Sequence, residues 1–103
     1  MAAPTRVAAR IDSYLFALLA EIADLPNVTA EWDSLSPAAR ASVSLDWDHL
    51  LADYLPELET HYHAAAMTAE QRERYGELRR QLQAALPLFE RLGWLPIPVP
   101  LTD

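Results

Sequence analysis

Three side chains in the middle of the chain have the chemistry and spacing of metal ligands. His49, Asp53 and Glu57 recur at intervals of four residues, which places them on one side of a helix. Asp46 precedes His49 by three residues, the spacing found in one half of a carboxylate-bridged diiron site. A complete site needs two such motifs and two further carboxylates, and this sequence supplies one motif. The pattern favours a solvated polar face, with a weak metal site at His49, Asp53 and Glu57 as the alternative.

Other residue patterns that carry catalysis are missing from the sequence. There are no cysteines, so cysteine nucleophiles, thiolate zinc sites and disulfides are excluded. Only two glycines occur, too few for a glycine-rich loop that cradles phosphate. The serines lie in predicted helices or helix caps rather than in a strained turn between strand and helix. We therefore expect a protein that is not an enzyme and holds no cofactor.

Trp32 and Trp47 each stand between two acids, in the segments EWD and DWD. On a helix the neighbours of a residue lie about 100° to either side of it, so an inward Trp47 places its two acids at the boundary with water. Tryptophan is also frequent among residues that dominate protein interfaces, and acids on an interface rim attract a basic partner. The candidates for partner binding are therefore Trp32, Trp47, Asp46 and Asp48. Rings buried in the protein's own core are the alternative.

Residues 94–103 are nearly free of charge and cannot form a helix. Three prolines at alternate positions enforce an extended, polyproline-like backbone. We expect such an apolar segment to be buried. It can pack on the protein's own helices or on another chain, which includes a swap between the protomers of a dimer. The candidate partner-binding residues of this tail are Trp94, Leu95, Ile97, Val99 and Leu101.

The net charge of −7 is concentrated in the middle of the chain. Residues 28–64 hold seven acids and one arginine, whereas residues 65–103 hold five of each and residues 1–27 hold three acids and two arginines. An acidic middle segment repels the phosphates of nucleic acids and the heads of anionic lipids. We expect neither nucleic acid nor a membrane as the partner.

Length and composition predict one globular domain. A chain of 103 residues with 51% hydrophobic and 22% charged residues is typical of a soluble domain. No stretch reaches the roughly 18 apolar residues that span a bilayer, and no segment has the pattern of a targeting signal. We therefore expect a cytoplasmic protein. All eight basic residues are arginine, which together with many alanines, leucines and prolines indicates a GC-rich, bacterial genome.

Apolar residues at helical spacing predict the first helix over residues 5–25. Pro26 is expected to end it, because the residue before a proline avoids helical backbone angles. In the connector that follows, Thr29 is a candidate N-cap of one short turn that carries Trp32 and Leu35.

Ser36 and Pro37 have the pattern of an N-cap followed by proline at the first helical position. They predict a second helix that extends to about residue 65. Pro56 lies inside this stretch and removes one backbone donor, so a kink or a break is expected there.

The third helix begins at a capping box formed by Thr68 and Gln71. Pro87 is expected to kink it, and Gly93 is expected to cap its C-terminal end. Three amphipathic helices with short connections predict an all-α fold, a small antiparallel three-helix up-down bundle with proline-kinked helices. Residues 1–93 would form this bundle and residues 94–103 an extended, proline-rich tail.

These features favour a non-enzymatic interaction protein, a small helical subunit or accessory factor of a larger assembly. One alternative is an acidic inhibitor of the antitoxin or immunity type, which would cover a basic partner. A third is a bundle with weak metal binding or enzymatic activity. The expected partner is another protein, basic in the inhibitor alternative, or a second copy of the chain in a homodimer.

Overall fold

The first helix, α1, spans Arg6–Glu31 in a computed structural model that describes residues 6–94 and 96–101. Its buried side chains recur every three or four residues and form one stripe, which consists of Ile11, Leu15, Leu18, Ile22 and Leu25. The predicted end of this helix before Pro26 is wrong, because the helix continues through the proline. Proline costs a helix one hydrogen bond, and buried contacts on the residue before it, Leu25, hold the backbone helical despite that loss.

Thr29 therefore lies inside α1 and is not an N-cap. Its hydroxyl donates to the carbonyl of Leu25 over 2.9 Å, one turn earlier in the same helix. A single 3-10 turn, η1 (Trp32–Ser34), follows directly. The predicted short turn carrying Trp32 is thus present, as an extension of α1 rather than as a separately capped element.

Arg40 fixes the connection between α1 and α2. Its Nε donates to the carbonyl of Trp32 over 2.9 Å, and its Nη2 donates to the carbonyl of Asp33 over 3.1 Å. The same guanidinium lies 5.7 Å from the centre of the Trp32 ring. One arginine on the first turns of α2 thereby gives the Asp33 carbonyl a donor and the Trp32 carbonyl, which also accepts from the N–H of Leu35, a second one.

The second helix, α2, spans Pro37–His63 and begins as predicted. The Ser36 side chain accepts from the backbone N–H of Ala39 over 3.1 Å, with Pro37 at the first helical position. Pro56 lies within a continuous helix, so the chain does not break there. The end of α2 is two residues earlier than expected.

The turn after α2 is a Schellman motif built without glycine. The N–H of Ala65 donates to the carbonyl of Tyr62 over 3.3 Å, and the N–H of Ala66 donates to the carbonyl of His61 over 3.0 Å. This geometry requires a left-handed residue, and Ala65 has a φ of 55°.

The third helix, α3, spans Ala69–Arg91, and the predicted capping box at its start is confirmed. Thr68 and Gln71 bond reciprocally, each side chain to the other's backbone, over 3.1 and 3.0 Å. The Gln71 amide also reaches α1, where it donates to the carbonyl of Ala8 over 3.1 Å and to the Asp12 carboxylate over 2.9 Å. The cap therefore also joins the first turns of α1 and α3.

Gly93 ends α3 as predicted, with a φ of 73°. The N–H of Gly93 donates to Glu90 over 3.1 Å, and the N–H of Trp94 donates to Phe89 over 2.9 Å, so this turn is also a Schellman motif. Pro87 lies within the continuous helix. The turn sends the chain back across the molecule with the Trp94 ring beside the ring of Phe89, their centres 5.0 Å apart.

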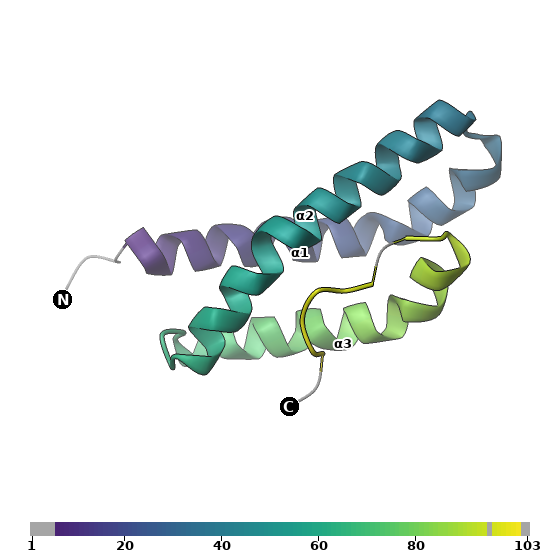
Figure 1. Cartoon of the computed structure of the whole chain (residues 1–103). Helices are drawn as coiled ribbons and strands as arrows, with labels where there is room; N and C mark the ends of the chain where they lie inside the picture. The colour runs from purple at the N-terminus through teal and green to yellow at the C-terminus, as the bar shows by residue number, and fades with distance from the viewer. Residues whose placement is uncertain (1–5, 95, 102–103) are drawn as a thin grey trace.

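The three helices form an up-down-up bundle, and the predicted all-α fold is confirmed (Figure 1). In Figure 1 α1 and α3 run in the same direction, and α2 runs back across them. The chain after α3 turns back between α2 and α3 and packs against the core. The buried core draws on all three helices and on the connections after α2 and α3, and it consists of Ile11, Leu15, Leu18, Ile22, Leu25, Trp47, Leu51, Leu55, Leu58, Met67, Tyr75, Leu78, Leu82, Phe89 and Trp94.

Within the described part of the chain, no helix has the length and apolarity needed to cross a lipid bilayer.

Replacing Ala65 by glycine should stabilise the protein. Left-handed backbone costs a non-glycine residue about 1–2 kcal/mol, and glycine offsets part of that gain through the larger entropy of the unfolded chain. We expect the free energy of unfolding to rise by about 0.5–1 kcal/mol, measured by urea denaturation followed by circular dichroism. Ala64→Gly is the matched control, because Ala64 has a φ of −80° and glycine there should destabilise. Equal losses in both variants would contradict the assigned turn.

Candidate functional site

Four aromatic rings meet where the chain after α3 passes between α2 and α3, and they are Trp32, Trp47, Phe89 and Trp94. The Trp47 and Trp94 rings are stacked with centres 5.5 Å apart, and Trp47 lies 5.6 Å from Phe89. Trp32 meets Trp94 edge-on at 6.2 Å. Trp47 is 4% exposed and Trp94 is 8% exposed. Two of the predicted partner-binding rings are therefore core residues of the folded chain, and Trp32 lies half-buried at the edge of the cluster.

The tail packs on the protein's own helices through its apolar side chains. Ile97, Val99 and Leu101 are half-buried against the core, and Leu95 lies outside the described residues. Residues 96–101 make no hydrogen bond to the rest of the described chain. Apolar contact alone therefore holds this segment in place beyond Trp94.

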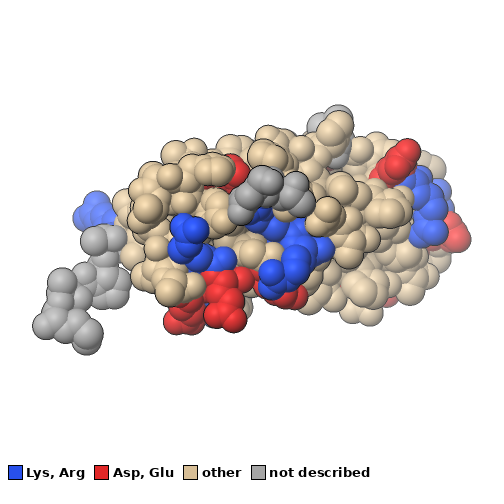
Figure 2. All heavy atoms as spheres, turned by 90° about the horizontal axis from the view of Figure 1, so that it is seen from below, with Lys and Arg blue, Asp and Glu red and all other residues tan. Residues whose placement is uncertain are grey.

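The charges of α3 nearly cancel in number, with four acids and five arginines. Arg80 donates to Glu77 over 2.7 Å, and this hydrogen bond holds the pKa of Glu77 below its usual value. Arg74 lies 4.0 Å from the Asp12 carboxylate of α1. Figure 2 shows the α3 side of the molecule. Arginines and acids lie together on one part of this side and again at one end, with an uncharged stretch between them.

In α1, η1 and α2 acids outnumber arginines by ten to three. Glu21, Asp46, Asp48 and Asp53 make no side-chain hydrogen bond or ion pair with any residue that the structure describes. Asp46 is exposed and Asp48 half-buried on either side of the buried Trp47, as the sequence predicted. A surface cavity of about 250 Å³ lies between the two helices and is lined by Glu21, Asp46, Trp47 and Leu50. This cavity combines uncompensated negative charge with apolar side chains.

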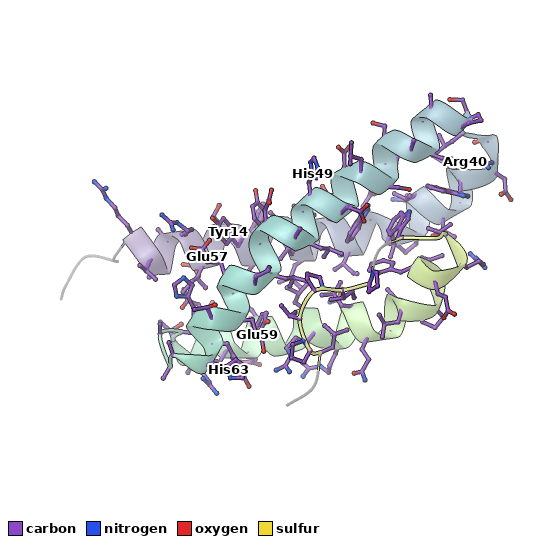
Figure 3. All side chains as sticks on the ribbon, viewed as in Figure 1. Tyr14, Arg40, His49, Glu57, Glu59 and His63 are labelled. Atoms are coloured by element: carbon purple, nitrogen blue, oxygen red, sulfur yellow. The ribbon has the colours of Figure 1, made fainter. Side chains whose placement is uncertain are left out.

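The structure does not assemble the metal site considered from the sequence. His49 projects outward from α2, away from Glu57 (Figure 3), and Asp53 is also exposed. Glu57 is engaged by α1, because the Arg10 guanidinium donates to it over 2.8 Å. Among the residues described, no three His, Cys, Asp or Glu side chains lie together in a way that could hold a metal ion.

Glu57 instead anchors a polar contact between α1 and α2. The hydrogen bond from Arg10 holds the pKa of the Glu57 carboxyl below its usual value. Burial, followed by the hydrogen bond to Glu57, raises the pKa of the Tyr14 hydroxyl. The Tyr14 ring stacks on the ring of Tyr54 with their centres 4.3 Å apart and their planes within 7°. These contacts use the carboxylate that the metal hypothesis required.

A second polar group joins α2 to α3 and was not predicted from the sequence. Glu59 is 9% exposed, and it accepts a hydrogen bond from the hydroxyl of Tyr75. His63 Nε2 lies 2.7 Å from the other oxygen of the same carboxylate (Figure 3). The buried Arg79 guanidinium lies 5.6 Å from the centre of the Tyr75 ring. Because its partners satisfy both carboxylate oxygens, Glu59 serves as a link between the helices.

One signal in the sequence does place Glu59 at the interface of α2 with its neighbours. Glu59 follows Leu55 by four residues and Leu58 by one, so it borders the apolar stripe of α2. Arg79 borders the stripe of α3 in the same way, directly after Leu78. An acid and a base at such positions on successive helices can pair across the interface, although their spacing does not show which groups meet.

Comparison with known protein families, curated proteins and solved structures gives no match.

Trp94 should contribute more stability than any exposed residue of the tail. Trp94→Ala removes a buried ring that touches Trp47 and Phe89, and we expect the free energy of unfolding to fall by about 3–5 kcal/mol in a thermal or urea titration. Trp32→Ala is the control, because Trp32 is half-buried and meets only the edge of the cluster, and its loss should be less than half as large. A small loss in Trp94→Ala, no larger than that of an exposed surface residue, would show that this ring does not belong to the core.

Tyr75 should make the protein less stable in alkali. Burial and the hydrogen bond to Glu59 raise the pKa of its hydroxyl. The contribution of this hydroxyl to the free energy of unfolding is complete below about pH 10, the pKa of tyrosine in the unfolded chain. It is lost as the pH rises towards the higher pKa of the folded state, because the unfolded state then releases a proton that the folded state retains. The free energy of unfolding should therefore fall progressively as the pH rises above about 10.

Tyr75→Phe tests this assignment. At neutral pH the variant should lose about 1–3 kcal/mol, because the buried Glu59 carboxylate loses its donor. Its stability should also decline less steeply with rising pH than that of the wild type. An alkaline decline of unchanged slope would show that Tyr75 does not hold its proton in the folded state.

Proposed function

We propose that this chain is a non-enzymatic interaction protein, a small helical subunit or accessory factor of a larger assembly, that acts in the cytoplasm. The observation that carries the proposal is the row of acids on the α1 and α2 surface that lack partners within the described chain. On α3, by contrast, four acids are matched in number by five arginines, and Arg80 contacts Glu77 at 2.7 Å. Uncompensated charge in one region supports a role in attracting a partner of opposite sign.

The surface cavity between Glu21 and Asp46 supports a basic partner in particular. Its two carboxylates come from different helices, and Leu50 and Trp47 supply apolar area between them. An arginine or lysine suits such a site, because its aliphatic stem can cover apolar surface while its charged group meets the carboxylates. The same surface would serve an inhibitor of a basic protein, and the activity of the captured partner would distinguish the two roles.

Neutralising this surface should abolish binding while leaving the fold intact. The test variant is the triple substitution E21Q/D46N/D53N, and the matched control is E70Q/E73Q/E90Q, which removes the same charge from exposed positions of α3. Tagged proteins would be purified from the source cells, and retained proteins would be quantified by mass spectrometry at low and high salt. We expect a stoichiometric basic partner that the wild type and control retain and the test variant loses at least about tenfold.

Two results would contradict the proposal. A partner retained equally by the test variant and the control would place the interface elsewhere. Wild-type protein that retains no other chain in stoichiometric amount would remove the subunit and inhibitor roles together. Circular dichroism of each variant, with a helical signal equal to that of the wild type, shows that the comparison concerns binding rather than folding.

A further inference from the structure

Residues 96–101, which we call the strap, alternate between half-buried and exposed side chains. Ile97, Val99 and Leu101 are half-buried against the core, whereas the prolines at positions 96, 98 and 100 are exposed. A proline has no N–H to donate, and the strap makes no hydrogen bond to the rest of the described chain. Three half-buried aliphatic side chains therefore hold the strap on the helices.

The strap does not fill the groove between α2 and α3 in which it lies. A surface cavity of about 310 Å³ borders it on the α3 side and is lined by Leu86, Phe89, Glu90, Trp94, Pro96 and Ile97. A second cavity, of about 150 Å³, borders it on the α2 side and is lined by Asp48, Leu51, Ala52, Pro96 and Pro98. Side chains that face a gap lose their dispersion contacts on that side, so the strap is packed less closely than a core segment.

The helices beneath the strap are held together by other contacts. Each pair of helices is joined by a polar contact that does not involve the strap, namely Arg10 with Glu57, Gln71 with the carbonyl of Ala8, and Tyr75 with Glu59. In Figure 1 α2 diverges from α3 towards the end where α3 finishes, and the chain after α3 passes through the space between them. The strap can therefore leave this space without separating two helices.

We propose that the strap is a displaceable cover, which opens and closes over the groove between α2 and α3 while the three helices and Trp94 stay in place. Trp94 stays because its ring is 8% exposed and stacks on the ring of Trp47 with their centres 5.5 Å apart. Opening uncovers the apolar walls of the groove, Leu51 of α2 and Phe89 of α3, which are buried when the strap is closed. The strap thus controls access to an apolar surface.

The tether at Trp94 sets the balance between the closed and open states. Prolines fix the backbone angle φ at every second position, so the open strap stays extended and moves as a stiff unit. A short tether keeps it near the groove at a millimolar effective concentration. The closed state therefore predominates, and we expect the open state in about 1–10% of molecules. The cavity between Glu21 and Asp46 does not include the strap, so this proposal is independent of the partner proposed above.

Nuclear magnetic resonance of methyl groups tests the opening in the native chain. The methyl groups of Ile97, Val99 and Leu101 should show lower order parameters or more exchange broadening than those of Leu15 and Leu78, which are completely buried. Strap methyl groups as rigid as these two core residues would overturn the proposal.

The double substitution Ile97→Asp/Val99→Asp should hold the strap open in the full chain. The matched control is Val7→Asp/Phe16→Asp, which adds the same charge at positions of α1 that are 41% and 74% exposed. We expect the strap variant to keep the helical signal of the wild type and to lose less melting temperature than Trp94→Ala. Acrylamide should quench its tryptophan fluorescence more strongly than that of the control, because the rings beside the strap become accessible.

A synthetic peptide with the sequence of the strap, PIPVPL, probes the open groove. It should bind the strap variant about 10- to 100-fold more tightly than the wild type, whose groove is open in only about 1–10% of molecules. Binding would be followed through the resonances of Leu51 and Phe89. The control peptide PDPDPL should bind neither protein.

Two further results would overturn the proposal. A melting temperature of the strap variant as low as that of Trp94→Ala would make the strap part of the core. A PIPVPL peptide that binds the wild type and the strap variant equally, or binds neither, would show that the strap does not cover a groove that can open.

Discussion

The turn after α3 determines how the rest of the molecule packs. Gly93 adopts left-handed backbone, and the two hydrogen bonds of its Schellman motif point the next residue back towards α2. Trp94 thereby enters the space between Trp47 of α2 and Phe89 of α3, where its ring contacts both. Large rings can fill a space between helices that aliphatic side chains would leave partly empty. The bundle is thus closed by a segment that belongs to none of its helices.

Polar side chains determine how the helices are placed along one another. Gln71 ties the start of α3 to α1, Glu57 receives Arg10 from α1, and Glu59 receives Tyr75 from α3. An apolar stripe can slide by one turn with little change in buried area, whereas a hydrogen bond is lost by such a shift. These contacts therefore define the register, and they leave Glu21, Asp46, Asp48 and Asp53 of α1 and α2 without partners in the described chain.

Local signals in the sequence were sufficient for the ends of most helices. The Ser36 cap, the Thr68 capping box and the Gly93 turn all depend on residues within a few positions, and all three are confirmed. Pro26 was misjudged, because its effect on the backbone is weaker than the packing of the turns around it. The link from Glu59 to Tyr75 was missed because those residues are 16 positions apart and meet only when α2 and α3 pack. The same limit applies to the tail, whose position the sequence left open.

The aromatic cluster also has a spectroscopic consequence. The chain has three tryptophans, and all of them contribute rings to this one cluster. Indoles stacked 5.5 Å apart, as Trp47 and Trp94 are, couple their electronic transitions and share an environment from which water is largely excluded. The tryptophan fluorescence of the protein, and the tryptophan bands of its near-ultraviolet dichroism, therefore originate at the place where the tail meets the bundle. The native chain carries its own optical probe of that junction, and no label is needed to observe it.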